Sequence, residues 1–265
     1  MSLLFSSFMT NTWIAATAIA VVAGFVGFFV VLRGASFLAH ALPHGAFAGA
    51  AGAVLIGVDP LVGMGVFAIA GAFTVSALGR RARADVVIAL TLVMMLGLGA
   101  LFLSMGSEYS SEVFSLLFGQ ILGVSAGELG PVIVLGVLSI VAVLVLYRPL
   151  VYTSTLPAQA SARGIRLDRV ALAFALIVAI ATTMSVPIVG ALLMFSLLVG
   201  PPAAARSFTS RPMPAIVLSV ALALVTVWAS IALAFETEWP VGFFVTAVSA
   251  VLYGIARLHS AVRHG

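Results

Sequence analysis

Residues 13–32, WIAATAIAVVAGFVGFFVVL, form a run of twenty amino acids without a charged side chain. A helix of that length crosses a hydrocarbon core about 30 Å thick. No basic residue precedes the run and no small-residue cleavage site ends it, so we expect a retained membrane span and not a signal peptide. Similar apolar runs recur along the 265-residue chain. The pattern predicts an all-α, polytopic integral membrane protein.

The composition supports this fold class and excludes several kinds of chemistry. Hydrophobic residues make up 63% of the chain and charged residues 8%, against roughly a quarter charged in soluble domains. Lipid cannot satisfy free backbone groups, and the apolar runs are continuous, so we expect one helical bundle over residues 1–265 and not a β-barrel. With no cysteine, thiolate metal sites and thiol nucleophiles are excluded.

All twelve basic residues are arginine. Without lysine the chain has no Walker lysine, so any ATP used in its function must be bound by another chain. The net charge is +4, but the arginines fall between apolar runs, which argues against nucleic acid as a partner. We expect nine spans, at 13–32, 36–57, 60–79, 86–106, 130–147, 170–186, 188–204, 213–235 and 240–257.

The arginines also predict the orientation of these spans. With the N-terminus outside, all twelve arginines fall on one side of the membrane, which the positive-inside rule makes the cytoplasmic side. The C-terminus is then cytoplasmic, and we expect a multi-pass membrane protein. Between Glu108 and Glu128 lies an apolar segment, residues 112–124, that is too short to cross, so we expect an interfacial or re-entrant helix there.

Two further segments depart from plain spanning helices. The span at 188–204 is bounded by glycine and proline, and interrupted short helices are typical of transport proteins, although ordinary packed kinks have the same composition. We place expected breaks at these positions and in the second span, at Pro43, Pro187, Gly190, Pro201 and Pro202. The cytoplasmic connection, about 149–169, contains PAQASARG at 157–164, a pattern typical of a short capped helix. This helix is either a docking element or part of a solvated linker.

Two histidines fall inside the second span, in the sequence FLAHALPHGAFAG at 37–49. His40 and His44 are four residues apart and share one helix face, so both imidazoles can reach one point. Pro43 between them frees the carbonyl of Ala39. Ionisable groups within a membrane usually mark a pathway or a partner, and neutral imidazole binds zinc, copper, nickel and iron. A metal-binding pair is therefore predicted, with interface packing as the alternative.

Hydrolytic chemistry is not expected at this pair. Intramembrane zinc proteases use the pattern H-E-x-x-H, in which the glutamate is the general base. Here the glutamate position is Ala41, and no acid lies in the same span. Downstream, the small residues at 45–52 are expected to allow close contact between helices.

Taken together, these motifs resemble the permease subunit of metal-ion ABC importers, the group that imports zinc, manganese or iron(II). The family pattern G-D-A-L-S-H-A-x-x-P-G is similar to residues 39–49, with His44 on the family histidine and His40 on the family aspartate. LFGQILGVS at 117–125, VGALLMFSLLVGPPAAAR at 189–206 and WPVGFFV near the C-terminus also resemble family motifs. PAQASARG is similar to the family's D-P-E-x-A-x-x-x-G, although both acids are missing.

The resemblance implies a homodimer that translocates the ion along its axis, two copies of a cytoplasmic ATPase, and an extracytoplasmic protein that delivers the metal. It implies an ion site at His40 and His44 and no resident cofactor. The segment that couples to the ATPase would include Pro157, Ala160, Arg163, Gly164 and Arg166.

Zinc is the expected ion, because an imidazole in place of a carboxylate moves preference away from manganese. Two subunits would supply four nitrogens, a number compatible with a tetrahedral site. The alternatives are a manganese or iron(II) permease, a cobalamin- or siderophore-type permease, and a stand-alone secondary transporter. A secondary transporter would be expected to carry membrane acids, and only Asp85 lies near a span.

Overall fold

The computed structural model describes residues 7–79, 83–106 and 123–264, and these residues form helices and no strand. The helices are α1 (Ser7–Leu32), α2 (Ser36–Leu55), α3 (Pro60–Leu78), α4 (Ala84–Met105), α6 (Ala126–Thr155), α7 (Pro157–Ala162), α8 (Leu167–Phe208), α9 (Pro212–Thr237) and α10 (Val241–His264). All but α7 are long and apolar enough to cross a membrane, which makes eight such helices in the described part. The expected all-α, multi-pass architecture is confirmed. The helix expected at 112–124 lies almost entirely outside the described residues.

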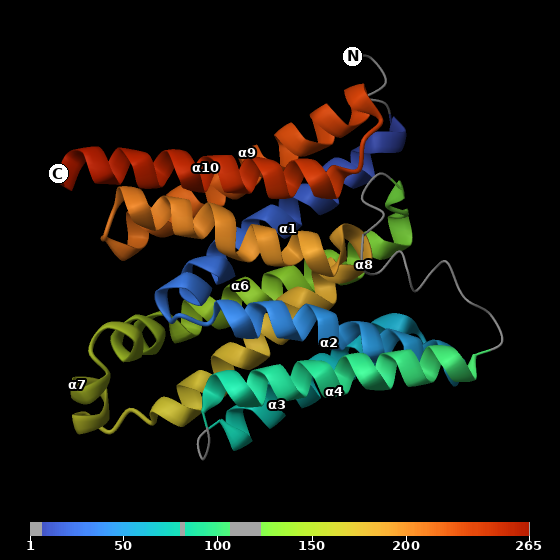
Figure 1. The fold of residues 1–265 in the computed structure, drawn as a ribbon, viewed down its shortest axis with the longest axis horizontal. Helices are drawn as coiled ribbons and strands as arrows, with labels where there is room; N and C mark the ends of the chain where they lie inside the picture. The colour runs from blue at the N-terminus through green and yellow to red at the C-terminus, as the bar shows by residue number, and fades with distance from the viewer. Residues whose placement is uncertain (1–6, 80–82, 107–122, 265) are drawn as a thin grey trace.

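The 42-residue helix α8 crosses the bundle and returns. Phe174, near its start, lies beside Arg33, whose guanidinium carbon is 5.4 Å from the ring centre. Ala203, near its end, lines a cavity with Val31 and Ser36. Since Val31, Arg33 and Ser36 surround the short connection between α1 and α2, both ends of α8 lie at that end of the bundle, as Figure 1 shows in gold and orange. The helix therefore carries both spans expected at 170–186 and 188–204.

The reversal of α8 occurs at Gly190. This residue has φ 80° and ψ 159°, outside the helical region, and it is buried. Side chains with a Cβ almost never adopt this conformation, so glycine is what permits the chain to turn here. The two halves of α8 lie in the centre of the bundle, with α1, α2, α3, α6, α9 and α10 packed around them (Figure 1).

At several positions where we expected a break, the helix is continuous. The backbone stays helical at Pro187, and α8 continues through Pro201 and Pro202 to Phe208. A proline inside a helix removes one hydrogen bond but is tolerated where neighbouring helices enclose the freed carbonyl. Here Gly27 of α1 lies against the Leu198 carbonyl, the group that Pro202 cannot bond.

The fifth predicted span is also longer than expected. We predicted an end at residue 147, but α6 continues through Arg148 and Pro149 to Thr155. Arginine is a good helix former, and Arg33 donates to Thr153 Oγ1 and Ser154 Oγ at 2.9 and 3.2 Å, which holds the last turn of α6 in place. The connection after this span is therefore shorter than the predicted 149–169 loop.

Glycine allows α2 to approach its neighbours closely. A Cβ on Gly49 would collide with the Gly63 carbonyl oxygen of α3, and a Cβ on Gly63 would collide with the Gly49 carbonyl oxygen. A Cβ on Gly52 would lie 3.0 Å from the Phe102 ring of α4. The packing role expected for the small residues at 45–52 is confirmed. With α3 and α4 held this close, another face of α2 remains for its histidines.

We expect Gly190→Ala to destabilise the protein, because the substituted residue must hold a conformation that costs about 1–3 kcal/mol outside glycine. The measurement is the thermal unfolding midpoint of the detergent-solubilised protein. Gly97→Ala is the matched control, since a Cβ at Gly97 meets nothing within 4 Å. Equal midpoints for the two variants would contradict the role given to Gly190.

Candidate functional site

His40 and His44 lie one helical turn apart on α2, and their rings approach each other. The ring centroids are 4.5 Å apart and the planes are inclined by 42°. Both side chains are partly exposed, so they can be reached from the surface of this chain. Pro43 lies between them in continuous helix, so the helix break expected at Pro43 is not present. The expected convergence of the two imidazoles is therefore present in the structure.

The hydrogen bonds of the pair indicate which ring nitrogens are free. His44 Nδ1 lies 3.0 Å from the His40 carbonyl oxygen. Since a carbonyl can only accept, His44 Nδ1 is the donor in this contact, and in the neutral ring Nε2 then has a free lone pair. His40 Nδ1 is buried and has no hydrogen-bond partner among the described residues. An unpaired buried polar atom costs about 1–3 kcal/mol, so binding an ion or a water there would recover that free energy.

Phe195, in the second half of α8, packs edge-on against His40 with ring centroids 4.8 Å apart. It lies five residues after the reversal at Gly190, so the broken helix brings an aromatic ring to the histidine pair. Pro201 and Pro202 lie further along this half, and Pro202 lies against Gly27 of α1. Sequence reasoning missed Phe195, because the contact joins segments 155 residues apart and no local pattern marks it.

Within the described part of the chain, the histidine pair offers two imidazole nitrogens as metal ligands. Among the described residues, no three histidine, aspartate or glutamate side chains come close enough to hold one metal ion. One copy of the chain therefore presents a weak, open, two-nitrogen site. Additional ligands would have to be water or groups from outside this chain.

Arg33, at the connection between α1 and α2, joins three segments at one end of the bundle. Its Nη1 donates to Thr153 Oγ1 at 2.9 Å and to Ser154 Oγ at 3.2 Å, both in the last turn of α6. Its guanidinium also lies against the Phe174 ring of α8. Burial lowers the pKa of Arg33 from its ordinary value, and these contacts replace the water it has lost. Arg33 thus connects the start of the histidine helix to the end of the helix that leads into α7.

The expected coupling segment folds as a short helix, α7, followed by a tight turn. Pro157 occupies its first turn and Gly164 has φ 77°, the arrangement predicted from PAQASARG. Ala160 is fully buried, whereas Arg163 and Arg166 are exposed. The segment lies at the left of Figure 1, at the end of the bundle opposite the N-terminus.

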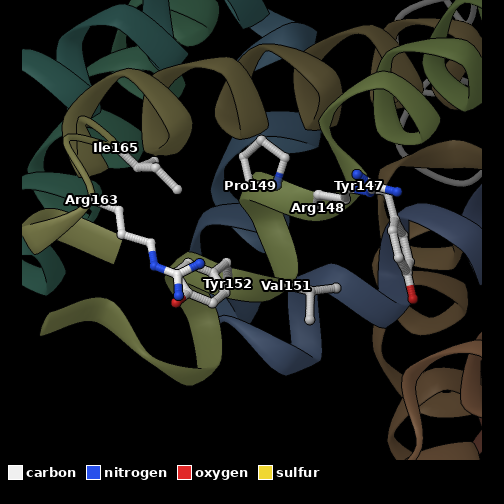
Figure 2. A pocket seen from close by; sticks show the side chains of 7 residues that line it. All are labelled: Tyr147, Arg148, Pro149, Val151, Tyr152, Arg163 and Ile165. Carbon is white, nitrogen blue, oxygen red and sulfur yellow. The ribbon is translucent and has the colours of Figure 1, made fainter. Parts of the chain in front are cut away.

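A cavity of about 550 Å³ lies between this turn and the end of α6. Figure 2 shows Arg163 extending over the Tyr152 ring, with its guanidinium carbon 5.3 Å from the ring centre. Seven residues line the cavity: Tyr147, Arg148, Pro149, Val151, Tyr152, Arg163 and Ile165. This end of the molecule therefore offers a concave, mainly apolar surface with two arginines.

These features define a multi-pass helical membrane protein with a paired-histidine site and an exposed helical turn at one end. The sequence matches the ABC 3 transport family over residues 6–260. The chain belongs to this family, and the expected resemblance to the permeases of metal-ion ABC importers is confirmed.

Two relatives align with almost the whole chain. The manganese import system permease protein ScaB of Streptococcus parasanguinis is 27% identical over 251 residues, covering 94% of this chain and 89% of the relative. The manganese transport system membrane protein MntC of Listeria monocytogenes is 24% identical over 254 residues, covering 95% and 90%. The solved structure of PsaBC from Streptococcus pneumoniae in complex with Fab has a TM-score of 0.86 at 23% identity, over 96% of this chain and 92% of that chain. The last comparison supports the fold.

We expect Arg33→Ala to destabilise the protein by about 1–3 kcal/mol, because two hydroxyls and a ring lose a partly buried, charged partner. The thermal unfolding midpoint in detergent measures this loss. Arg257→Ala serves as the control, since that arginine is exposed on α10. An unchanged midpoint for Arg33→Ala would show that the three segments hold together without it.

Proposed function

We propose that this chain is the membrane-spanning subunit of an ATP-driven importer that moves a divalent transition-metal ion across a bacterial plasma membrane. The observation that carries the proposal is the pair His40 and His44, whose rings converge on α2. Because the chain belongs to a transport family, we interpret the pair as a site through which an ion passes and not as a fixed structural metal site. A translocation site has to release its ion, so a weak, two-nitrogen arrangement suits the task.

A second copy of the chain would complete the site. Two histidine pairs facing each other supply four nitrogens, a number that suits tetrahedral coordination. The partly exposed position of both histidines leaves them accessible to such a copy. The transported ion would then pass along the interface between the two copies.

Manganese and zinc are the two candidate ions, each favoured by a different observation. ScaB and MntC are named for manganese, and this makes manganese the first candidate. The donor set favours zinc, because two imidazoles without a carboxylate suit borderline ions better than hard ones. Transport measured with both ions decides between them.

We expect His44→Ala to reduce metal uptake by at least about tenfold, because loss of even an outer-shell partner typically weakens a metal site 10- to 100-fold. The measurement is uptake of radioactive manganese and zinc into vesicles containing the chain, its ATPase and its binding protein. His259→Ala is the matched control, since His259 lies on α10 beside Phe208 and away from the pair. Normal uptake of both ions by His44→Ala would contradict a role for the pair in translocation.

In the same vesicles, His40→Asp should raise manganese uptake relative to zinc, because a carboxylate oxygen is a harder ligand than imidazole nitrogen. A wild-type protein that already prefers manganese would identify manganese as the cargo. If the ratio of manganese uptake to zinc uptake is the same for His40→Asp and the wild type, His40 has no role in ion selection.

The proposed machinery needs further proteins, each suggested by a feature of the chain. The absence of lysine excludes a Walker site, so two copies of a cytoplasmic ATPase would supply the energy and contact α7. An extracytoplasmic metal-binding protein would deliver the ion at the other end. From the positive-inside rule we infer that the N-terminus lies outside and the C-terminus in the cytoplasm.

Arg163→Glu is expected to weaken association with the ATPase, because it reverses a charge on the exposed turn after α7 and removes the contact with Tyr152. Co-purification of the ATPase with the permease measures this association. Arg257→Glu, an exposed arginine on the last helix, controls for the change in net charge. Equal recovery of the ATPase with both variants would argue against α7 as the docking element.

A further inference from the structure

A second polar feature lies on the same side of the bundle as the histidine pair. Between α2, the second half of α8 and α10 there is a cavity of about 480 Å³. Five of its lining residues carry hydroxyl groups, and we call this feature the hydroxyl groove. The five are Ser36, Ser196, Thr246, Ser249 and Tyr253.

The hydroxyls of the groove have free oxygen lone pairs. Thr246 Oγ1 donates to the Gly242 and Phe243 carbonyls at 3.0 and 2.8 Å, and Ser196 Oγ donates to the Leu192 carbonyl at 3.3 Å. A hydroxyl has one proton and two acceptor sites, so these oxygens can still accept from water or coordinate a cation.

Ser249 gives an independent indication that the groove holds a polar ligand. Its side chain is 4% exposed and lines the groove. Its Oγ is buried and has no hydrogen-bond partner among the described residues. Ser219, by contrast, is a buried hydroxyl that donates to the Gly24 carbonyl at 2.7 Å, whereas Thr12 Oγ1, away from the groove, also lacks a partner among the described residues. A buried hydroxyl without a partner is expected to bind water or an ion.

Phe195 separates the groove from the histidine pair. Its ring packs against His40 on one side and lines the groove on the other. Val31 and Ser36 place the groove at the end of the bundle that contains Arg33 and the last turn of α6. The groove therefore lies between the histidines and the end at which α7 leaves the bundle.

We propose that the hydroxyl groove is a second, oxygen-lined ion site through which a partly hydrated divalent metal ion leaves the histidine pair toward the cytoplasm. Phe195 is the apolar barrier between the two sites. This inference rests on the proposed function. Neutral hydroxyl oxygens and water suit a hard or hydrated cation and hold it without a charged ligand, so the ion can be released at this end.

The absence of native cysteine allows a direct test. Thr246→Cys and Ser196→Cys, at groove-lining side chains that are not buried, are each made in the full chain, assembled with its ATPase and binding protein in inside-out vesicles, and treated with a membrane-impermeant thiol reagent. Val251→Cys is the matched control, because Val251 lies on α10, is 60% exposed, and does not line the groove. A thiol in a hydrated groove ionises and reacts, whereas one against lipid does not, so the groove positions should react at least about tenfold faster.

Manganese is then added as its chloride salt during labelling. If the groove binds the ion, manganese should slow modification of Thr246→Cys and Ser196→Cys and leave that of Val251→Cys unchanged. Groove cysteines that react no faster than Val251→Cys would overturn the proposal, because the groove would then be covered by lipid or protein. Fast labelling without protection by metal would also overturn it as an ion site.

Transport supplies a second readout that separates this proposal from the proposed function. Thr246→Val keeps the side-chain shape and removes the oxygen, and uptake should fall severalfold while the amount of assembled complex stays the same. Thr74→Val, a similar change at a hydroxyl bonded only to its own helix on α3, is the control. Normal uptake by Thr246→Val would overturn the groove alone, whereas failure of the wild type to take up either metal would overturn the proposed function.

Discussion

The structure depends on one constraint, which is that a hydrocarbon layer offers no hydrogen-bond partner to the backbone. Every crossing must therefore be helical, and any interruption must be enclosed by protein. The reversal of α8 satisfies this condition, because Gly190 is buried in the middle of the bundle and six other helices surround α8. Such a turn at the lipid surface would leave backbone groups unpaired, so the interruption could only be placed at the centre of the protein.

Close packing and polar function are divided between the faces of α2. Glycine lets its backbone contact α3 at Gly49 and Gly63 and α4 at Gly52. Dispersion and backbone contacts hold this face, since lipid removes the hydrophobic driving force between helices. The other face carries His40 and His44, where the second half of α8 supplies Phe195. The closely packed face thus holds α2 in place, and the other face presents imidazole nitrogens that are free to bind an ion.

Arg33 gives this arrangement a physical link to the end of the bundle that carries α7. Its hydrogen bonds to Thr153 and Ser154 and its contact with Phe174 are made three residues before α2 begins. A displacement of the last turn of α6 would therefore be transmitted to the start of the histidine helix through charge-assisted hydrogen bonds, which are stronger than neutral ones. The same connection borders the hydroxyl groove at Val31 and Ser36, so the two proposed ion sites and the proposed coupling segment share one junction.

The sequence by itself determined the fold class, the approximate spans, the capped helix at 157–162 and the convergence of His40 and His44, because each depends on local spacing along a helix or on transfer of apolar runs from water to lipid. It did not reveal that α6 extends to Thr155, that Pro201 and Pro202 remain helical, or that Phe195 meets His40. These features were decided by the tertiary structure. A proline bends or does not bend a helix according to what encloses its freed carbonyl, and an aromatic ring reaches an imidazole 155 residues away only once the bundle has assembled.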